Sequence, residues 1–437
     1  MSLVPALLLA LAGTGPGDTT LTLAQAMRLA QQRGTQAAVA RVNASLAQER
    51  IGERRADLLP TINGFVGLTR ATNNLDEFGI PIATGLVTDP FNVTRLRLGG
   101  SQALLDLPAL TRLQAAGDSA EAAASDAVAA GAAAATRAGA AYVRLQGAEA
   151  TILARRADSA LAADLLAQAR QLAEAGVGTS IDVTRNEVNL ESVATALVLA
   201  RGERDRTRLA LLQALALPLE TRLVLADSLG VEDVQLAGGE DEAVAIAVAN
   251  RPELAAERQR TAVAMLARRA IAQENLPSAQ LSGYVQESAG LSGDYAGTWN
   301  VAIGIAVPIL DGFRRQRRHA EQTLRIEAQE LREADTLREI DAQARTSVID
   351  LQSAREQIAV ARRRVTLAQQ ELQQSQERFT AGVAGSVETT NAQRGLVAAR
   401  DALIQARVAL DVARVTAYRA LGLTFPGTGT MEEKDGR

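Results

Sequence analysis

The sequence contains no cysteine and a single histidine, His319. The absence of cysteine excludes disulfides, thiol chemistry and cysteine metal sites, and a lipid on an N-terminal cysteine is not expected. One histidine makes a histidine metal site or a histidine-dependent triad improbable. Ser386 and Thr389 have no base or histidine near them in the sequence, so no nucleophile is indicated. We therefore expect that the protein is not an enzyme and holds no cofactor.

Aromatic residues make up only 3% of the 437 residues, and Lys434 is the only lysine. The net charge is −4 and the basic residues are spread along the chain, so nothing points to nucleic acid. No later apolar run approaches the ~18–20 residues of a membrane-spanning helix, so a chain that spans a membrane would do so with strands. The short apolar run at 3–11 resembles a secretory signal peptide, although Pro5 interrupts it, and we expect one at 1–12.

Alanine, leucine, glutamate, glutamine and arginine dominate the chain, and these residues favour long helices. The pattern predicts helices at 23–58, 111–174, 181–215, 241–275, 313–380 and 387–421. The two longest have ~65 residues, or ~97 Å at 1.5 Å per residue, whereas an ordinary helix has ~11–12 residues. The fold is therefore expected to be extended and mainly helical.

One of the long helices carries a coiled-coil pattern. Large residues stand seven apart, and small residues follow them by three positions: Leu351, Ile358, Val365, Leu372 and Phe379, with Ala354, Ala361, Ala368 and Ser375. This spacing predicts a knobs-into-holes seam in which small partners let two helices approach closely.

The two halves of the chain are similar in sequence. The tripeptide at 175–177 recurs at 381–383, and the dipeptide at 105–106 recurs at 310–311, in the same order. A period of this length indicates a duplicated domain rather than a solenoid. We expect a first repeat at 20–217, a linker at 218–240, a second repeat at 241–425 and a C-terminal tail at 426–437, with a longer loop in the first repeat around 79–90.

A pair of alternating segments follows the proline that ends a helix in each half, at Pro60 and Pro277. In the last segment, Trp299, Val301, Ile303, Ile305 and Val307 alternate with Asn300, Ala302, Gly304 and Ala306. Strands of ~10 residues cross a bilayer when tilted, and Trp299 would serve as an interfacial anchor. Arg95 and Arg97 would then face a water-filled lumen. The alternative is a pair of soluble hairpins packed on helices.

Several local motifs together resemble those of the outer-membrane efflux protein family, the TolC-like channels, over roughly residues 20–425. They are LTLAQA at 21–26, LLP at 58–60, LP at 276–277, VPILDG at 307–312 followed by two arginines, AGVGTSIDV at 175–183 and AGVAGSVE at 381–388. The resemblance implies a mainly helical fold with membrane strands: long antiparallel helical hairpins in a trimeric α-barrel, plus a β-barrel of twelve strands, four per protomer. It also implies a linker and tail that form a belt around the helical tunnel.

The function implied by this resemblance is a passive conduit in the outer membrane of a Gram-negative type of cell. Such a homotrimer contacts outer-membrane lipid, reaches through the periplasm and joins a periplasmic adaptor protein, and through it an inner-membrane pump, in tripartite efflux or type I secretion. The alternative function is a secreted or soluble coiled-coil scaffold. A lipid-facing strand around Trp299 argues against this alternative.

The candidate site lies at the two glycine-rich turns between long helices. By resemblance, the residues that contact the adaptor are Gly176, Val177, Gly178, Thr179, Gly382, Val383, Ala384 and Gly385; the alternative is that they are only tight turns. By resemblance, the entrance and lumen are lined by Asp182, Arg185, Glu388 and Asn391. Asp182 and Glu388 either form a ring that favours cations, with Arg185 pairing to an acid, or simply stabilise helix N-termini.

Four arginines follow the last expected strand: Arg314, Arg315, Arg317 and Arg318. They fit either a positive collar at the membrane surface or solvated residues at a helix start that pair with Glu321. The second interpretation is the simpler one.

Overall fold

The structure, a computed structural model, describes residues 19–74, 87–230, 236, 238–289 and 294–428. The expected signal peptide lies outside the described residues. So do most of the expected loop at 79–90, part of the expected linker and the end of the expected tail. Among the described helices, none is both long and apolar enough to span a membrane.

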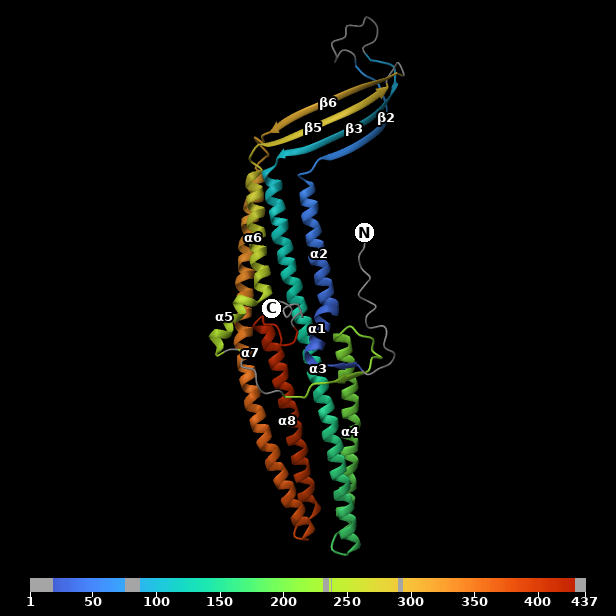
Figure 1. Cartoon of the computed structure of the whole chain (residues 1–437), viewed down its shortest axis with the longest axis vertical. Helices are drawn as coiled ribbons and strands as arrows, with labels where there is room; N and C mark the ends of the chain where they lie inside the picture. The colour runs from blue at the N-terminus through green and yellow to red at the C-terminus, as the bar shows by residue number, and fades with distance from the viewer. Residues whose placement is uncertain (1–18, 75–86, 231–235, 237, 290–293, 429–437) are drawn as a thin grey trace, which may run out of the picture. The chain divides into compact units, whose positions relative to one another are not determined.

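The order of elements is the same in both halves, which confirms the internal duplication (Figure 1). The first half contains β1 (Thr19–Leu21), α1 (Leu23–Arg33), α2 (Thr35–Ala56), β2 (Thr61–Ala71), β3 (Phe91–Leu105), α3 (Leu107–Glu174) and α4 (Ser180–Ala214). The second half follows as β4 (Leu223–Leu225), α5 (Glu240–Asn250), α6 (Pro252–Gln273), β5 (Ser278–Ala289), β6 (Tyr295–Ala306), α7 (Arg314–Thr380) and α8 (Ser386–Ala420).

Two helices that we expected to be continuous are each divided in two. The helix predicted at 23–58 breaks at Gly34, where a Cβ atom would lie 2.5 Å from the carbonyl oxygen of Ala30. The helix predicted at 241–275 breaks before Pro252, because proline disfavours helical backbone in the preceding residue and Arg251 is accordingly extended, with ψ 118°. A proline is tolerated at the first position of the new helix.

The described chain divides into two compact units. One comprises Asn43–Ala124 and Ala255–Ala334, and the other comprises the rest of the described residues. Because α2, α3, α6 and α7 pass from one unit into the other, each contributes residues to both.

The unit that contains residues 43–124 and 255–334 is built on an antiparallel sheet with strand order β2-β3-β5-β6 (Figure 1). The register aligns Gly64 with Leu98, Leu98 with Val285, and Val285 with Trp299, so the apolar residues of all four strands share one face. The strands have 11, 15, 12 and 12 residues, slightly longer than expected. Both edge strands, β2 and β6, have one side without a partner strand in the described chain.

The opposite face of this sheet is polar. The register places Arg97 beside Phe65 and Gln286, and the guanidinium of Arg97 lies 3.8 Å from the centre of the Tyr284 ring. Arg95 lies opposite Ser288 on the same face. The sheet therefore has the two-sided character that the alternation predicts.

The other unit is formed by packed helices, including the hairpins α3–α4 and α7–α8. The predicted seam of α7 is buried: Leu351, Ala354, Ile358 and Ala361 pack with four residues of α8, namely Ala406, Leu410, Ala413 and Ala417. Nearer the turn, Ala368 and Leu372 pack with Ala392, Leu396 and Ala399. Small residues on both helices allow this close approach, as expected.

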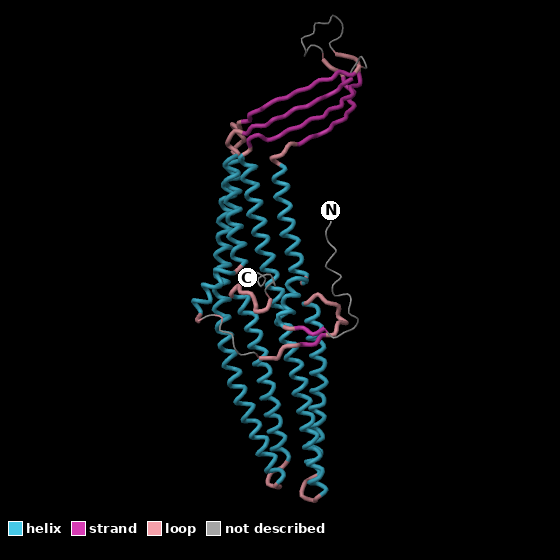
Figure 2. Tube along the Cα trace, viewed as in Figure 1, coloured by secondary structure: helices cyan, strands magenta, loops and turns pink. Residues whose placement is uncertain are grey.

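A short parallel pair of strands, β1 and β4, joins the first element of the first half to the first element of the second half (Figure 2). The buried hydroxyl of Tyr142 on α3 donates to the carbonyl of Leu21 at 2.7 Å, and Asp227 accepts from the backbone N–H of Leu23 at 2.5 Å. Burial raises the pKa of Tyr142 to about 12, so this hydroxyl remains a donor at neutral pH.

Candidate functional site

Both turns between the long helices end the preceding helix in the same way. Gly176 and Gly382 adopt left-handed backbone, with φ 77° and φ 70°. The N–H of Val177 donates to the carbonyl of Leu172, and the N–H of Val383 donates to that of Arg378, each at 3.0 Å. These are the bonds of a Schellman cap, which requires a residue without a Cβ penalty at the glycine position.

The residue after each of these glycines is an exposed valine. Val177 and Val383 are both 69% exposed, although an apolar side chain at a turn is not needed for the cap. The two turns lie together, because Val177 Cγ1 is 3.9 Å from the position that a Cβ atom would take on Gly382. The structure therefore brings the predicted tip residues of both halves into one place.

Asp182, at the start of α4, reaches from one hairpin to the other. Its carboxylate accepts from the backbone N–H of Ser386 at 3.3 Å and from the Ser386 hydroxyl. Thr179 donates to the second carboxylate oxygen. Ser386 is the first residue of α8, so its N–H has no partner inside that helix and favours a negative charge. Asp182 thus caps the helix of the neighbouring hairpin.

The pKa of Asp182 is lowered from its ordinary value of 3.8. Partial burial by itself would raise the pKa, but the hydrogen bonds from Ser386 and Thr179 stabilise the carboxylate and outweigh this effect. At neutral pH the group is an ionised acceptor.

The other three predicted entrance residues are arranged differently. Glu388 pairs with Arg378 of its own hairpin at 2.9 Å, and both side chains are about half exposed. Arg185 Nη1 lies 3.9 Å from Asp182 Oδ1, and Asn391 is exposed. Within the described chain, Asp182 binds Ser386 whereas Glu388 pairs with Arg378. Asp182 therefore caps α8, which is not its own helix.

A buried polar network further from the turns was not found by sequence reasoning. Asp158 on α3 is 1% exposed and lies 2.7 Å from Arg400 of α8 and 3.0 Å from Arg155. Asn189 of α4 donates to Gln393 of α8 at 2.8 Å, and both amides are buried. The sequence offered one signal for this network: polar residues stand at helix positions that face the core. Heptad spacing does not show which of these polar residues contact one another across helices.

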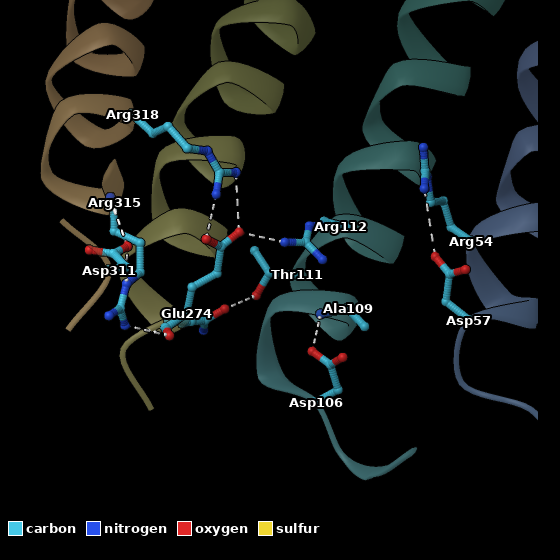
Figure 3. A network of polar contacts seen from close by, with 11 residues as sticks. Arg54, Asp57, Asp106, Ala109, Thr111, Arg112, Glu274, Asp311, Arg315 and Arg318 are labelled. Carbon is cyan, nitrogen blue, oxygen red and sulfur yellow. Dashed lines mark hydrogen bonds and ion pairs between the residues drawn. The ribbon is translucent and has the colours of Figure 1, made fainter. Parts of the chain in front are cut away.

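The arginines after β6 are partly neutralised at the helix ends (Figure 3). Glu274, near the end of α6, lies 2.6 Å from both Arg318 and Arg112. Arg315 pairs with Asp311 at 2.7 Å. Glu321 was the wrong partner for this cluster, because it pairs with Arg325 one turn further along α7. Two of the four arginines are thus held by carboxylates that the linear sequence did not indicate.

Trp299 is an exposed residue on the apolar face of the sheet. Its side chain shares this face with the exposed side chains of Val301, Ile303 and Ile305. An exposed tryptophan on an apolar face suits an anchor at the membrane interface. This role of Trp299 stays a prediction.

A family model described as outer membrane efflux protein matches residues 26–217 and 243–423. The fold is similar to that of the outer-membrane channel OprN, with a TM-score of 0.79 and 20% sequence identity over 92% of this chain and 89% of that one. It is similar to CusC, with a TM-score of 0.81 and 18% identity over 92% of each chain. The fold is also similar to that of the open state of the Neisseria gonorrhoeae MtrE outer membrane channel, with a TM-score of 0.76 and 20% identity over 92% of this chain and 89% of that one. No curated protein matches the sequence significantly.

Proposed function

Because the chain belongs to the outer membrane efflux protein family, we propose that three copies of it form a passive conduit through the outer membrane and the periplasm. The family resemblance expected from the motifs is confirmed, and with it the mainly helical fold with strands and the outer-membrane location. Cargo would pass through the conduit without covalent change. The adaptor and the inner-membrane pump of a tripartite efflux or type I secretion system are the expected partners.

The observation that carries this proposal is the four-stranded sheet with one apolar face and two edge strands. Unpaired backbone groups at a sheet edge cannot be satisfied in hydrocarbon, so four strands are not stable there alone. If β6 of one copy pairs with β2 of the next, three copies supply twelve strands and leave no edge. Arg95 and Arg97 then face the aqueous side.

We further propose that the turns after α3 and α7 form the periplasmic end that meets the adaptor. Val177 and Val383 offer exposed apolar side chains that a helical partner would cover. The bond from Ser386 to Asp182 holds the two hairpins of one copy together and so favours a narrow entrance. Glu388, half exposed and paired with Arg378, places a carboxylate near the entrance in each copy.

The molar mass of the protein extracted from membranes tests the conduit directly. Light scattering with the detergent contribution removed should give about three chains of 45.9 kDa, close to 138 kDa. A monomer or dimer that stays in solution without detergent would contradict the proposal. That result would favour a soluble coiled-coil scaffold instead.

A further inference from the structure

We propose that the segment joining β6 to α7 binds the phosphate headgroups of anionic phospholipids at the helix-side surface of the membrane. In this proposal Arg314 and Arg317 contact the phosphates, while Ile309, Leu310 and Phe313 lie among the acyl chains. The inference rests on the proposed function, because it requires the sheet to cross the membrane.

The segment exposes an unusual amount of apolar surface. Ile309 is 92% exposed, Leu310 79% and Phe313 65%. Ile309 follows directly on the apolar series that runs from Trp299 to Val307 at every second residue. An exposed apolar patch beside polar residues marks an interaction surface.

The backbone holds Phe313 in a disfavoured conformation. Gly312 has φ 66°, which glycine tolerates, but Phe313 follows with φ 65°, where a Cβ atom is crowded. Strain of this kind persists where the surrounding structure enforces it and often accompanies function. Here it places an aromatic ring on the surface rather than in the core of the unit.

The charges beside this patch divide into two kinds. Arg315 and Arg318 are occupied by Asp311 and Glu274 (Figure 3). Arg314 and Arg317 are exposed. Arg314 lies near enough to Asp311 to interact with it electrostatically, but that carboxylate is paired with Arg315, and no ion pair is found for Arg314 or Arg317 among the residues that the structure describes. The pair is therefore available to an external anion, and its long side chains suit a boundary between apolar and aqueous phases.

The depth of the segment agrees with this role. β6 has 12 residues, or about 41 Å at about 3.4 Å per residue, which spans about 29 Å when tilted by about 45°. That distance matches a hydrocarbon core of about 30 Å. The hydrocarbon core crossed by β6 would therefore end close to Val307, so the residues that follow would lie at the boundary where the acyl chains meet the headgroups.

The combination of apolar insertion and cationic contact favours lipid over a second copy of the chain as the occupant. Aromatic and aliphatic side chains with arginines immediately beside them are the pattern of interfacial membrane binding. Each arginine near an anionic surface contributes about fivefold to binding. The competing occupant, a neighbouring copy, is distinguished by the experiment.

The test uses fluorescence quenching by brominated lipids in reconstituted vesicles. The chain contains a single tryptophan, so wild-type emission reports on Trp299 alone. A second protein carries Phe313→Trp and Trp299→Phe and reports on the segment. Vesicles contain either brominated phosphatidylcholine or a mixture in which only phosphatidylglycerol is brominated. If Phe313→Trp reduces the yield of trimer, Ile309→Trp takes its place.

We expect the reporter at position 313 to be quenched and to prefer phosphatidylglycerol by about fivefold or more. Adding Arg314→Gln and Arg317→Gln should bring this preference close to one. The matched control, Arg363→Gln with Arg364→Gln, removes the same charge from exposed positions of the same helix and should leave it unchanged.

Two negative outcomes separate the two proposals. Quenching of Trp299 without quenching at position 313, or without a preference for phosphatidylglycerol, would overturn the lipid site and leave the conduit standing. Absence of quenching at Trp299 as well would place the sheet outside the lipid and overturn the conduit itself.

Discussion

Replacing Ser386 by alanine tests whether the bond between the hairpins keeps the entrance narrow. The substitution removes the hydroxyl that donates to Asp182 but leaves the charge of the site and the backbone N–H of residue 386 in place. Ser386 is buried, and alanine leaves only a small void. We therefore expect weaker attachment of the two hairpins without loss of folding.

The size of the effect follows from the contacts. A hydrogen bond to a charged group contributes about 1.5–3 kcal/mol. The remaining N–H bond at 3.3 Å and the partial water access of Asp182, whose side chain is 14% exposed, place the loss near the lower end. About 1.5 kcal/mol corresponds to about a tenfold shift toward separated hairpins in each copy.

The assay is the frequency of openings of the reconstituted channel in a planar bilayer. Ser386→Ala should raise it by about tenfold. Thr389→Ala is the control, because Thr389 is also buried beside the turn but donates to Ser375 within its own hairpin. Equal effects of the two variants, or none from Ser386→Ala, would refute the reasoning.

The same bond defines a dependence on pH. Because the pKa of Asp182 is lowered below 3.8, its contribution is complete above that value and is lost as the pH falls through the lowered pKa. Opening frequency of the wild type should therefore be constant between pH 5 and pH 7 and should rise only under stronger acid. Asp182→Asn should abolish that rise; an unchanged acid response in this variant would assign it to another group.

Three further predictions concern other positions. Glu388→Gln should lower the cation selectivity of the open channel, and unchanged reversal potentials would contradict a role in the entrance field. Arg400→Met leaves the buried Asp158 with only its neighbouring arginine and should destabilise the fold by about 3 kcal/mol, measured as a lower Tm of the extracted protein; an unchanged Tm would mean that the pair contributes little. Gly382→Ala should lower the Tm because φ is 70°, at a cost of about 1 kcal/mol, whereas Gly385→Ala, with φ −83° and open space around it, should not.

The sequence was most informative where local periodicity decides structure. The alternation around Trp299 and the seven-residue spacing from Leu351 to Phe379 correctly placed a sheet face and a helical seam. The two broken helices were missed although Gly34 and Pro252 were visible. In the sequence pattern, the strong helix formers on both sides of each residue favoured one continuous helix. In the structure, the single glycine or proline sets the local backbone conformation and ends the helix.

The candidate site was only partly predictable. Both glycine turns were located because a left-handed cap has a local signature, but the arrangement of the acids was not. Asp182 and Glu388 occupy equivalent places in the repeat, yet one reaches Ser386 of the other hairpin and the other pairs within its own. Equivalent sequence positions need not have equivalent neighbours once two repeats pack against each other.

The sequence by itself determined the kinds of element, their order, their duplication and the faces that are buried, because each depends on residues a few positions apart. Only the tertiary structure decided that Asp182 caps α8, that Glu274 binds Arg112 and Arg318, and that Asp158 is enclosed by arginines. These contacts join residues far apart in the chain. Their formation depends on the relative rotation and register of packed helices to within an ångström or so, which periodicity alone does not specify.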